Sequence, residues 1–264
     1  MKITNHFIIT AMLLLSVVGM SFRSYESKPT LYIIGDSTVK NGSGNGADLL
    51  WGWGSFMGNY IDTTKIDIQN NAIGGRSSRT FLTDGRWDKI LETLKKGDYV
   101  MMQFGHNDGG PLDDTSRARG TLQGVGNDST EIFNPIRKVK ETVHSYGWYL
   151  RKYSNETKAK GATVIICSPI PRNDFTENGK INKDKYAVWA KEVAQQTGAY
   201  FIPLNDIVIE RYENEGAIAI KNYFPKDHTH TNKAGAQLNT QLVVKGLQLL
   251  KGCGLTKYIK QNIK

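Results

Sequence analysis

The sequence is poor in cysteine and lacks the short motifs that mark zinc and nucleotide sites. Its 264 residues include two cysteines, Cys167 and Cys253, which lie too far apart in the sequence to form the paired-cysteine spacing of a zinc motif. A P-loop and a Gly-x-Gly-x-x-Gly fingerprint are both missing, so the glycine-rich segment 42–46 is expected to be a flexible loop. The absence of a Gly-x-Ser-x-Gly elbow argues against an α/β-hydrolase.

Apolar runs long enough to cross a membrane are also missing. The apolar run 7–20 is shorter than the ~20 residues of a typical membrane span. Lys2 precedes it and small or polar residues follow it at 21–24, which is the layout of a secretory signal. We therefore expect a signal peptide at 1–24 and one domain at 25–264, secreted or periplasmic and free of the membrane once the signal is removed. A retained anchor is the alternative.

Export would permit a disulfide between the two cysteines. Cys167 lies inside the apolar run 162–167, however, where a free thiol serves as a small core residue. Unpaired thiols are therefore the favoured expectation, and a disulfide is the alternative.

Acidic residues are outnumbered by basic ones. The formal net charge is +9, and removal of the leader takes away Lys2 and Arg23 and leaves +7. Such an excess is compatible with an acidic partner, although much of it lies in clusters typical of solvated helices and tails. Nucleic acid is not expected, because no recognisable binding module is present.

Short apolar or β-branched runs alternate with helix-like stretches. This order is typical of βαβ units and predicts a three-layer α/β/α domain around a five-stranded parallel sheet. The predicted strands are 30–34, 66–70, 99–104, 162–167 and 199–203. Helices are predicted over 87–94, from Asn134-Pro135 through Tyr153, over 186–194 and from about Asn232 onward. The polar segment 109–130 is predicted to be a long loop, a lid or a wall of a substrate site.

In parallel sheets ligands bind beyond the carboxyl ends of the strands. The first predicted strand is followed by Gly-Asp-Ser-Thr, which places Ser37 where an acyl-transfer nucleophile would lie. Gly75 follows the second strand and Asn107 the third, and both offer neutral N–H donors for an oxyanion, together with the Ser37 amide. Each of these turns, taken alone, is also compatible with ordinary turn chemistry.

Asp227 and His230 lie on one turn before the last helix. An aspartate three residues before a histidine can fix its tautomer, so that the imidazole accepts the Ser37 proton as general base. A metal site at Asp227, His228 and His230 is disfavoured because no further ligand motif accompanies them.

Together these segments resemble the four signature blocks of the SGNH, or GDSL, hydrolase superfamily. The residues around the signature positions are similar to those of rhamnogalacturonan acetylesterases, as in Gly-Gly-Arg-Ser-Ser-Arg at 74–79 and Gly-His-Asn-Asp at 105–108. The resemblance implies the flavodoxin-like SGNH fold, catalytic Ser37, Asp227 and His230, an oxyanion hole of Ser37, Gly75 and Asn107, and no metal or organic cofactor. It also implies deacetylation of an acidic pectic polymer.

Four further residues are candidate substrate contacts: Trp53, Arg76, His106 and His228. For Arg76 and Arg79, pairing with uronate carboxylates and pairing with acids of the protein itself are both open alternatives. We expect a monomer acting on an acetylated polysaccharide. The alternatives are an esterase of acetylxylan or of small esters, and a carbohydrate-binding protein on the same fold.

Overall fold

A central parallel sheet organises the described part of the chain, residues 28–261 of the computed structural model. The predicted signal peptide at 1–24 lies outside these residues. The sheet has the order β2-β1-β3-β6-β7, and all of its strand pairs are parallel. Its strands are β1 (Thr30–Gly35), β2 (Asp67–Asn70), β3 (Tyr99–Gln103), β6 (Thr163–Cys167) and β7 (Tyr200–Ile202). All five predicted strands, and the three-layer α/β fold, are therefore confirmed.

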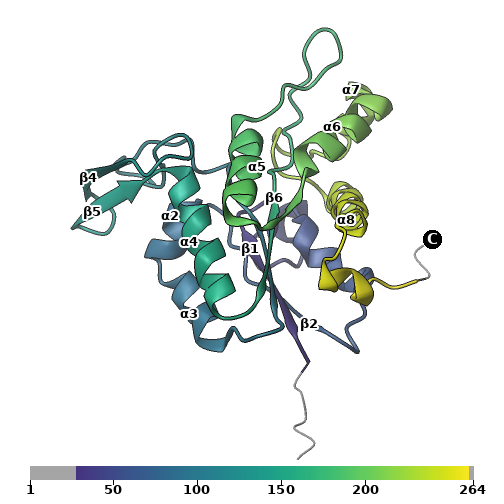
Figure 1. Ribbon diagram of the computed structural model, residues 1–264. Coiled ribbons are helices and arrows are strands. Elements are labelled where there is room, and N and C mark those ends of the chain that lie inside the picture. The colour runs from purple at the N-terminus through teal and green to yellow at the C-terminus, as the bar shows by residue number, and fades with distance from the viewer. Residues whose placement is uncertain (1–27, 262–264) are drawn as a thin grey trace, which may run out of the picture.

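Helices cover both faces of this sheet (Figure 1). The α-helices are α2 (Ser78–Thr83), α3 (Arg86–Thr93), α4 (Tyr146–Ala159), α5 (Lys185–Thr197), α6 (Leu204–Glu215), α7 (Ala217–Lys221) and α8 (Lys233–Gln248). Three 3₁₀ helices complete the described part: η1 (Ala47–Leu49), η2 (Trp53–Asn59) and η3 (Gly254–Tyr258).

Alternation along the strands divides the core in two. On β1, Ile33 packs into a cluster with α6, α8 and η2, whereas its neighbour Ile34 packs into a second cluster with α3, α4 and α5. Successive strand side chains point to opposite faces, so a strand covered by helices on both sides must be apolar throughout. This explains why β1, β3 and β6 read as continuous apolar runs in the sequence.

The helix predicted to start at Asn134-Pro135 is wrong in its first part. Residues 129–144 form an antiparallel hairpin of β4 (Ser129–Asn134) and β5 (Val139–His144), and α4 begins only after Ser145, whose side chain caps it. Asn134 accepts from the amides of Ile136 and Arg137 as a helix N-cap would, but Lys138 then takes a φ of 55°. The chain therefore reverses there instead of continuing as a helix.

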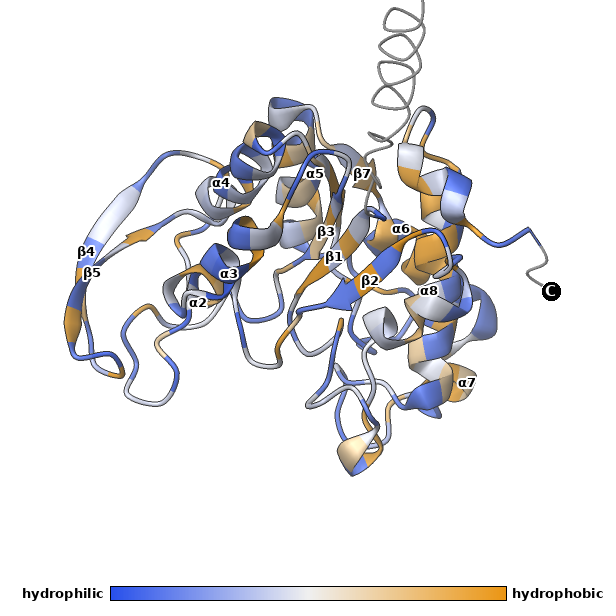
Figure 2. Cartoon of the chain, turned by 90° about the horizontal axis from the view of Figure 1, so that it is seen from below, coloured by the Kyte–Doolittle hydropathy of each residue, from blue (hydrophilic) through white to orange (hydrophobic). Residues whose placement is uncertain are grey.

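This hairpin projects from the body of the domain on the side of α2 and α4 (Figures 1 and 2). Residues 104–128 connect it to β3 without a helix or strand, which agrees with the long loop predicted over 109–130. Both cysteines are buried and free, as expected. No helix within residues 28–261 is both long and apolar enough to span a bilayer.

The turn after β1 is held against η2 by a close backbone approach. The amides of Trp53 and Gly54 donate to the carbonyls of Thr38 and Val39 at 3.0 and 2.9 Å. Gly52 lies directly on this turn, since a Cβ added to it would come within 2.3 Å of the Val39 carbonyl carbon. No side chain fits there without moving the backbone next to Ser37.

We therefore expect Gly52→Ala to lower the free energy of unfolding by about 1–3 kcal/mol, as overpacked cores do. Urea denaturation would measure this. Gly58→Ala is the matched control, because a Cβ there would meet its nearest neighbour at 3.9 Å. Equal stability of the two variants would contradict the steric account.

Candidate active site

Ser37 lies on the turn that leaves the carboxyl end of β1. The carboxylate of Asp36 shapes this turn, because its Oδ1 accepts from the amide of Thr38 at 2.9 Å and from its hydroxyl at 2.7 Å. The strand order reverses between β1 and β3, so a crevice opens beyond their ends. Ser37 is placed at that crevice and is 8% exposed.

His230 and Asp227 reach Ser37 from the segment before α8. The Oγ of Ser37 lies 2.8 Å from Nε2 of His230, and Nδ1 of the same ring lies 2.7 Å from Oδ2 of Asp227. The other oxygen of Asp227 accepts from the amides of Thr229 and His230. Partial burial would raise the pKa of Asp227, but these hydrogen bonds from His230 and Thr229 hold it below its ordinary value. The three predicted residues are thus brought into one hydrogen-bonded chain.

The segment carrying His230 is fixed to the body of the protein by its neighbour Thr231. The amide of Trp51 donates to the Thr231 carbonyl at 2.8 Å, and the Thr231 hydroxyl donates back to the Trp51 carbonyl at 3.1 Å. This two-bond bridge sets where the imidazole stands relative to Ser37.

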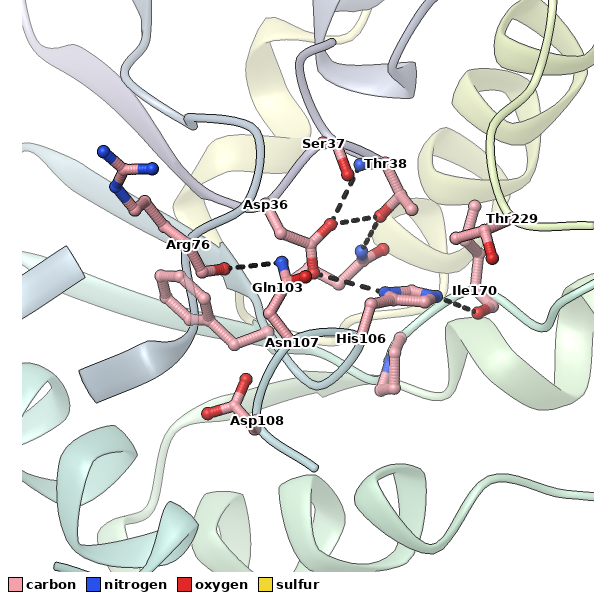
Figure 3. Close-up of polar contacts among 12 residues, drawn as sticks. Asp36, Ser37, Thr38, Arg76, Gln103, His106, Asn107, Asp108, Ile170 and Thr229 are labelled. Carbon is pink, nitrogen blue, oxygen red and sulfur yellow. Dashed lines mark hydrogen bonds and ion pairs between the residues drawn. The ribbon is translucent and has the colours of Figure 1, made fainter. Parts of the chain in front are cut away.

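Gly75 and Asn107 line the same pocket as Ser37 and His230. Gly75 has a φ of 77°, a conformation that glycine adopts without strain, and a Cβ on Gly74 would lie 3.5 Å from that of Ser37. One N–H of the Asn107 amide donates to the carbonyl of Arg76 at 2.9 Å, which orients the side chain (Figure 3). The second N–H is left for a ligand. Ser37, Gly75 and Asn107 can therefore offer neutral donors to one oxyanion.

A buried ion pair lies beneath the nucleophile (Figure 3). Nδ1 of His106 is 3.2 Å from Oδ2 of Asp36, and Nε2 is 3.0 Å from the carbonyl oxygen of Ile170. Burial alone would lower the pKa of His106, but the charge of Asp36 raises it above its ordinary value. Burial likewise would raise the pKa of Asp36, and His106 lowers it. His106 can therefore donate from both nitrogens as an imidazolium.

This pairing corrects the expectation that His106 contacts substrate. The ring borders the pocket, but its side chain is 3% exposed and both nitrogens already have acceptors. Its place between Asp36 and Ile170 joins the ends of β1, β3 and β6. His106 is thus a residue that positions the turn of Ser37.

Trp53 is a second correction. It is fully buried, and its indole N–H donates to Oε1 of Gln103 at 2.9 Å, while Nε2 of Gln103 donates to the hydroxyl of Thr38 at 2.6 Å. The side chain therefore supports the turn of Ser37 from below and has no surface for a sugar.

Asp108 connects the loop that carries Asn107 to the loop that carries Gly75. Its Oδ1 accepts from the amide and the hydroxyl of Ser78, at 3.0 and 2.5 Å. Full burial raises the pKa of this carboxyl to about 7, and the hydrogen bonds from Ser78 oppose that rise. The contact holds the start of α2, and with it the loop of Gly75, against the loop of Asn107.

Arg76 and Arg79 have different surroundings. Arg76 borders the pocket and donates to Asp84 at 2.7 Å. Arg79 is fully buried, with its Nε 2.7 Å from Glu141 on β5 and its Nη1 donating to the carbonyls of Leu112 and Gly120. Arg79 therefore pairs within the protein and does not face a substrate.

His228 points away from the pocket that Ser37 borders. Its Nδ1 lies 2.6 Å from Asp174, its side chain is 55% exposed, and it does not line the pocket. The geometry thus joins His230, and not His228, to Ser37.

Four arginines at the pocket were not predicted from the sequence. The cavity has a volume of about 570 Å³ and its lining includes Arg117, Arg119, Arg137 and Arg172 as well as Arg76. Asp84 is the one acid among its described lining residues. Arg172 follows β6, so the strand-end rule could have found it, whereas the loop and hairpin positions carried no such signal.

No group of three His, Cys, Asp or Glu side chains in residues 28–261 is arranged to hold a metal ion. The arrangement is instead that of nucleophile, base and orienting carboxylate, with neutral donors alongside. Such a set can transfer an acyl group from an ester to water.

Comparison with known proteins agrees with this geometry. A model of the GDSL-like lipase/acylhydrolase family matches residues 33–238. The chain is 30% identical over 236 residues to a rhamnogalacturonan acetylesterase of Emericella nidulans, covering 88% of this chain and 90% of that protein. The resemblance to this superfamily is thereby confirmed.

Solved structures share the fold. The protein YxiM of Bacillus subtilis superimposes with a TM-score of 0.65 at 28% identity, over 84% of this chain and 56% of that longer chain. An acetylxylan esterase of Geobacillus stearothermophilus gives a TM-score of 0.57 at 18% identity, over 83% of this chain and 94% of that one.

The buried pair of Asp36 and His106 predicts a pH-dependent stability difference. Asp36→Asn keeps an acceptor for Thr38 but removes the charge beside His106, and breaking such a pair costs about 3–5 kcal/mol. The pKa of His106 is raised in the folded protein. The contribution of the pair to the free energy of unfolding is therefore present below the pKa that His106 has in the unfolded chain, and it is lost as the pH rises through the pKa in the folded protein. Urea denaturation should show the gap to wild type largest near pH 6 and smaller at pH 9. A gap independent of pH would contradict an ionised pair.

Proposed function

The chain belongs to the GDSL-like lipase/acylhydrolase family of carboxylic ester hydrolases, and we propose that it removes acetyl groups from a pectic polysaccharide, rhamnogalacturonan. The observation that carries the proposal is the hydrogen-bonded chain from Ser37 through His230 to Asp227. Ser37 and His230 line one pocket together with two neutral donors, Gly75 and Asn107.

In the proposed first step, Oγ of Ser37 attacks the acetyl carbonyl carbon while Nε2 of His230 takes the hydroxyl proton. Asp227 holds the ring in the tautomer that leaves Nε2 free to accept, and it stabilises the imidazolium that forms. The developing oxyanion binds the amides of Ser37 and Gly75 and the free N–H of Asn107. Collapse of the tetrahedral intermediate returns the proton from His230 to the departing sugar oxygen and leaves Ser37 acetylated.

In the second step, a water molecule gives a proton to His230 and attacks the acetyl-enzyme. The second tetrahedral intermediate releases acetate, and the proton returns to Ser37. The protein's own residues carry every proton transfer in this scheme, and no cofactor enters it.

A polymeric, acidic substrate is supported by the pocket. The site is open at the surface, and its described lining has five arginines against one aspartate. Positive charge concentrated around a cleft raises the local concentration of an anionic substrate. The relative from Emericella nidulans named above is a rhamnogalacturonan acetylesterase, which agrees with a uronate-containing polymer.

We expect Ser37→Ala and His230→Ala each to lower acetate release from acetylated rhamnogalacturonan by about 10⁴-fold or more, as loss of a nucleophile or base does in serine hydrolases. His228→Ala is the matched control on the same turn and should keep activity within about twofold, because its ring faces Asp174. Loss of turnover in His228→Ala alone would overturn the assignment of the base. Faster release from acetylated xylan than from rhamnogalacturonan would favour the xylan alternative.

Residues 1–24 are proposed to direct export, and the mature protein is proposed to act as a monomer outside the cytoplasm. Expression of the full chain in a secreting host should yield a protein that begins near residue 25, because the leader is cleaved after its small and polar segment. N-terminal sequencing of the exported protein would measure the cleavage site. A secreted protein that still begins at residue 1 would contradict cleavage.

A further inference from the structure

The arginines of the pocket differ in whether an acid of the protein neutralises them. Arg76 pairs with Asp84, and Arg137 lies 3.6 Å from Glu141. Within residues 28–261, Arg117, Arg119 and Arg172 have no carboxylate within ion-pair distance. Three positive charges at the pocket therefore lack an acidic partner in the described part of the chain.

Of these three, Arg119 is the best placed to bind an anion. Its Nη1 donates to the carbonyl oxygen of Gly75 at 3.2 Å, so the guanidinium lies beside the proposed oxyanion hole. No other side-chain hydrogen bond of Arg119 is found in the described part of the chain, which leaves most of its five N–H donors for a ligand. Arg172, in contrast, already donates to Thr229 and to the carbonyl of His106, and Arg117 is exposed.

Partial burial strengthens the interaction that Arg119 can make with an anion. The residue is half-buried, and desolvation together with the nearby charge of Arg117 lowers its pKa, while the carboxylates of Asp114, Asp108 and Asp36 raise it. A guanidinium with little water around it gains more from a bidentate carboxylate than an exposed one does.

The loop that carries Arg119 is held rigidly. Oδ1 of Asp114 accepts from the amides of Ser116 and Arg117, at 2.8 and 2.5 Å. Ala118 is buried with a φ of 40°, a left-handed conformation that persists only where the surroundings impose it. The backbone that leads into Arg119 is therefore constrained.

Buried Arg79 fixes the far end of the same loop. Its Nη1 donates to the carbonyls of Leu112 and Gly120, both at 2.8 Å, and its Nε holds Glu141 of the hairpin. Gly120 itself lies against Gly110, whose carbonyl oxygen would be 1.8 Å from an added Cβ. Arg79 and this close contact hold the backbone next to Arg119.

We propose that Arg119 binds the carboxylate of a uronic acid residue of the substrate and is the residue that selects acidic over neutral polysaccharides. The inference rests on the proposed function, since it concerns the substrate of that same site. A uronate held by Arg119 stands next to Gly75, so its binding places an acetyl group of the same chain near Ser37.

Steady-state kinetics on acetylated rhamnogalacturonan, acetylated xylan and p-nitrophenyl acetate test this. We expect Arg119→Gln to raise KM for the acidic polymer by about 10- to 100-fold, the range for a lost charge-assisted bidentate contact. The KM values of Arg119→Gln for acetylated xylan and for p-nitrophenyl acetate should stay within about twofold of those of the wild type. Arg119→Lys should lie between wild type and Arg119→Gln, because a lysine keeps the charge without the bidentate geometry.

Arg211→Gln is the matched control, because it removes one arginine charge on α6 outside this pocket. It should leave all three substrates unchanged, and thermal melting would confirm that each variant folds. An equal loss on all three substrates in Arg119→Gln would overturn the inference, since Arg119 would then act only by holding Gly75. Unchanged KM for the acidic polymer would overturn it as well.

Binding without turnover separates this inference from the proposed function. Calorimetry would measure the affinity of wild type and Arg119→Gln for deacetylated rhamnogalacturonan oligosaccharides and for xylo-oligosaccharides. Preferential binding of the acidic oligosaccharide that Arg119→Gln abolishes would support the carboxylate site even if no acetate were released from the polymer. Equal affinity of wild type for both oligosaccharides would overturn it, and acetate release from rhamnogalacturonan would still test the esterase separately.

Discussion

The buried pair of Asp36 and His106 is the interaction on which the site depends. Asp36 precedes Ser37 at the end of β1, His106 precedes Asn107 after β3, and the second nitrogen of His106 reaches the carbonyl of Ile170 after β6. Three strand ends are thereby joined beneath one crevice. Since a charge removed from water must be paired, this contact also determines which turns can lie side by side.

Charge is distributed unevenly between the interior and the pocket. Acids such as Asp36 and Glu141 are buried and paired with His106 and Arg79, whereas the charged residues that line the pocket are mostly arginines. This distribution leaves an electropositive pocket beside Ser37. Several of these arginines lie on the hairpin and the long loop. Buried Arg79 holds both segments, through Glu141 of the hairpin and the carbonyl of Gly120 in the loop.

Much of the fold could be predicted because helices covering both faces of a parallel sheet force its strands to be apolar throughout. The five apolar runs followed this rule. The predicted helix start near Asn232 followed from capping, since Asn232 is the N-cap of α8. The hairpin was not predicted, because Asn134-Pro135 supplies the same local hydrogen bonds to a tight turn as to a helix start. Only the pairing of β4 with β5, and the packing of Glu141 on Arg79, distinguishes the two.

The sequence by itself predicted the site residues in chain order: Ser37, Gly75, Asn107, then Asp227 with His230. It could do so because each lies in a short turn whose residue types are local. The tertiary structure alone decided that Trp53 and His106 support the turn of Ser37 and that Arg119 lies at Gly75. These outcomes depend on burial and on partners far apart in the chain, such as Ser37 and His230 with a separation of 193 residues. Local sequence carries no record of which distant group will neutralise a charge.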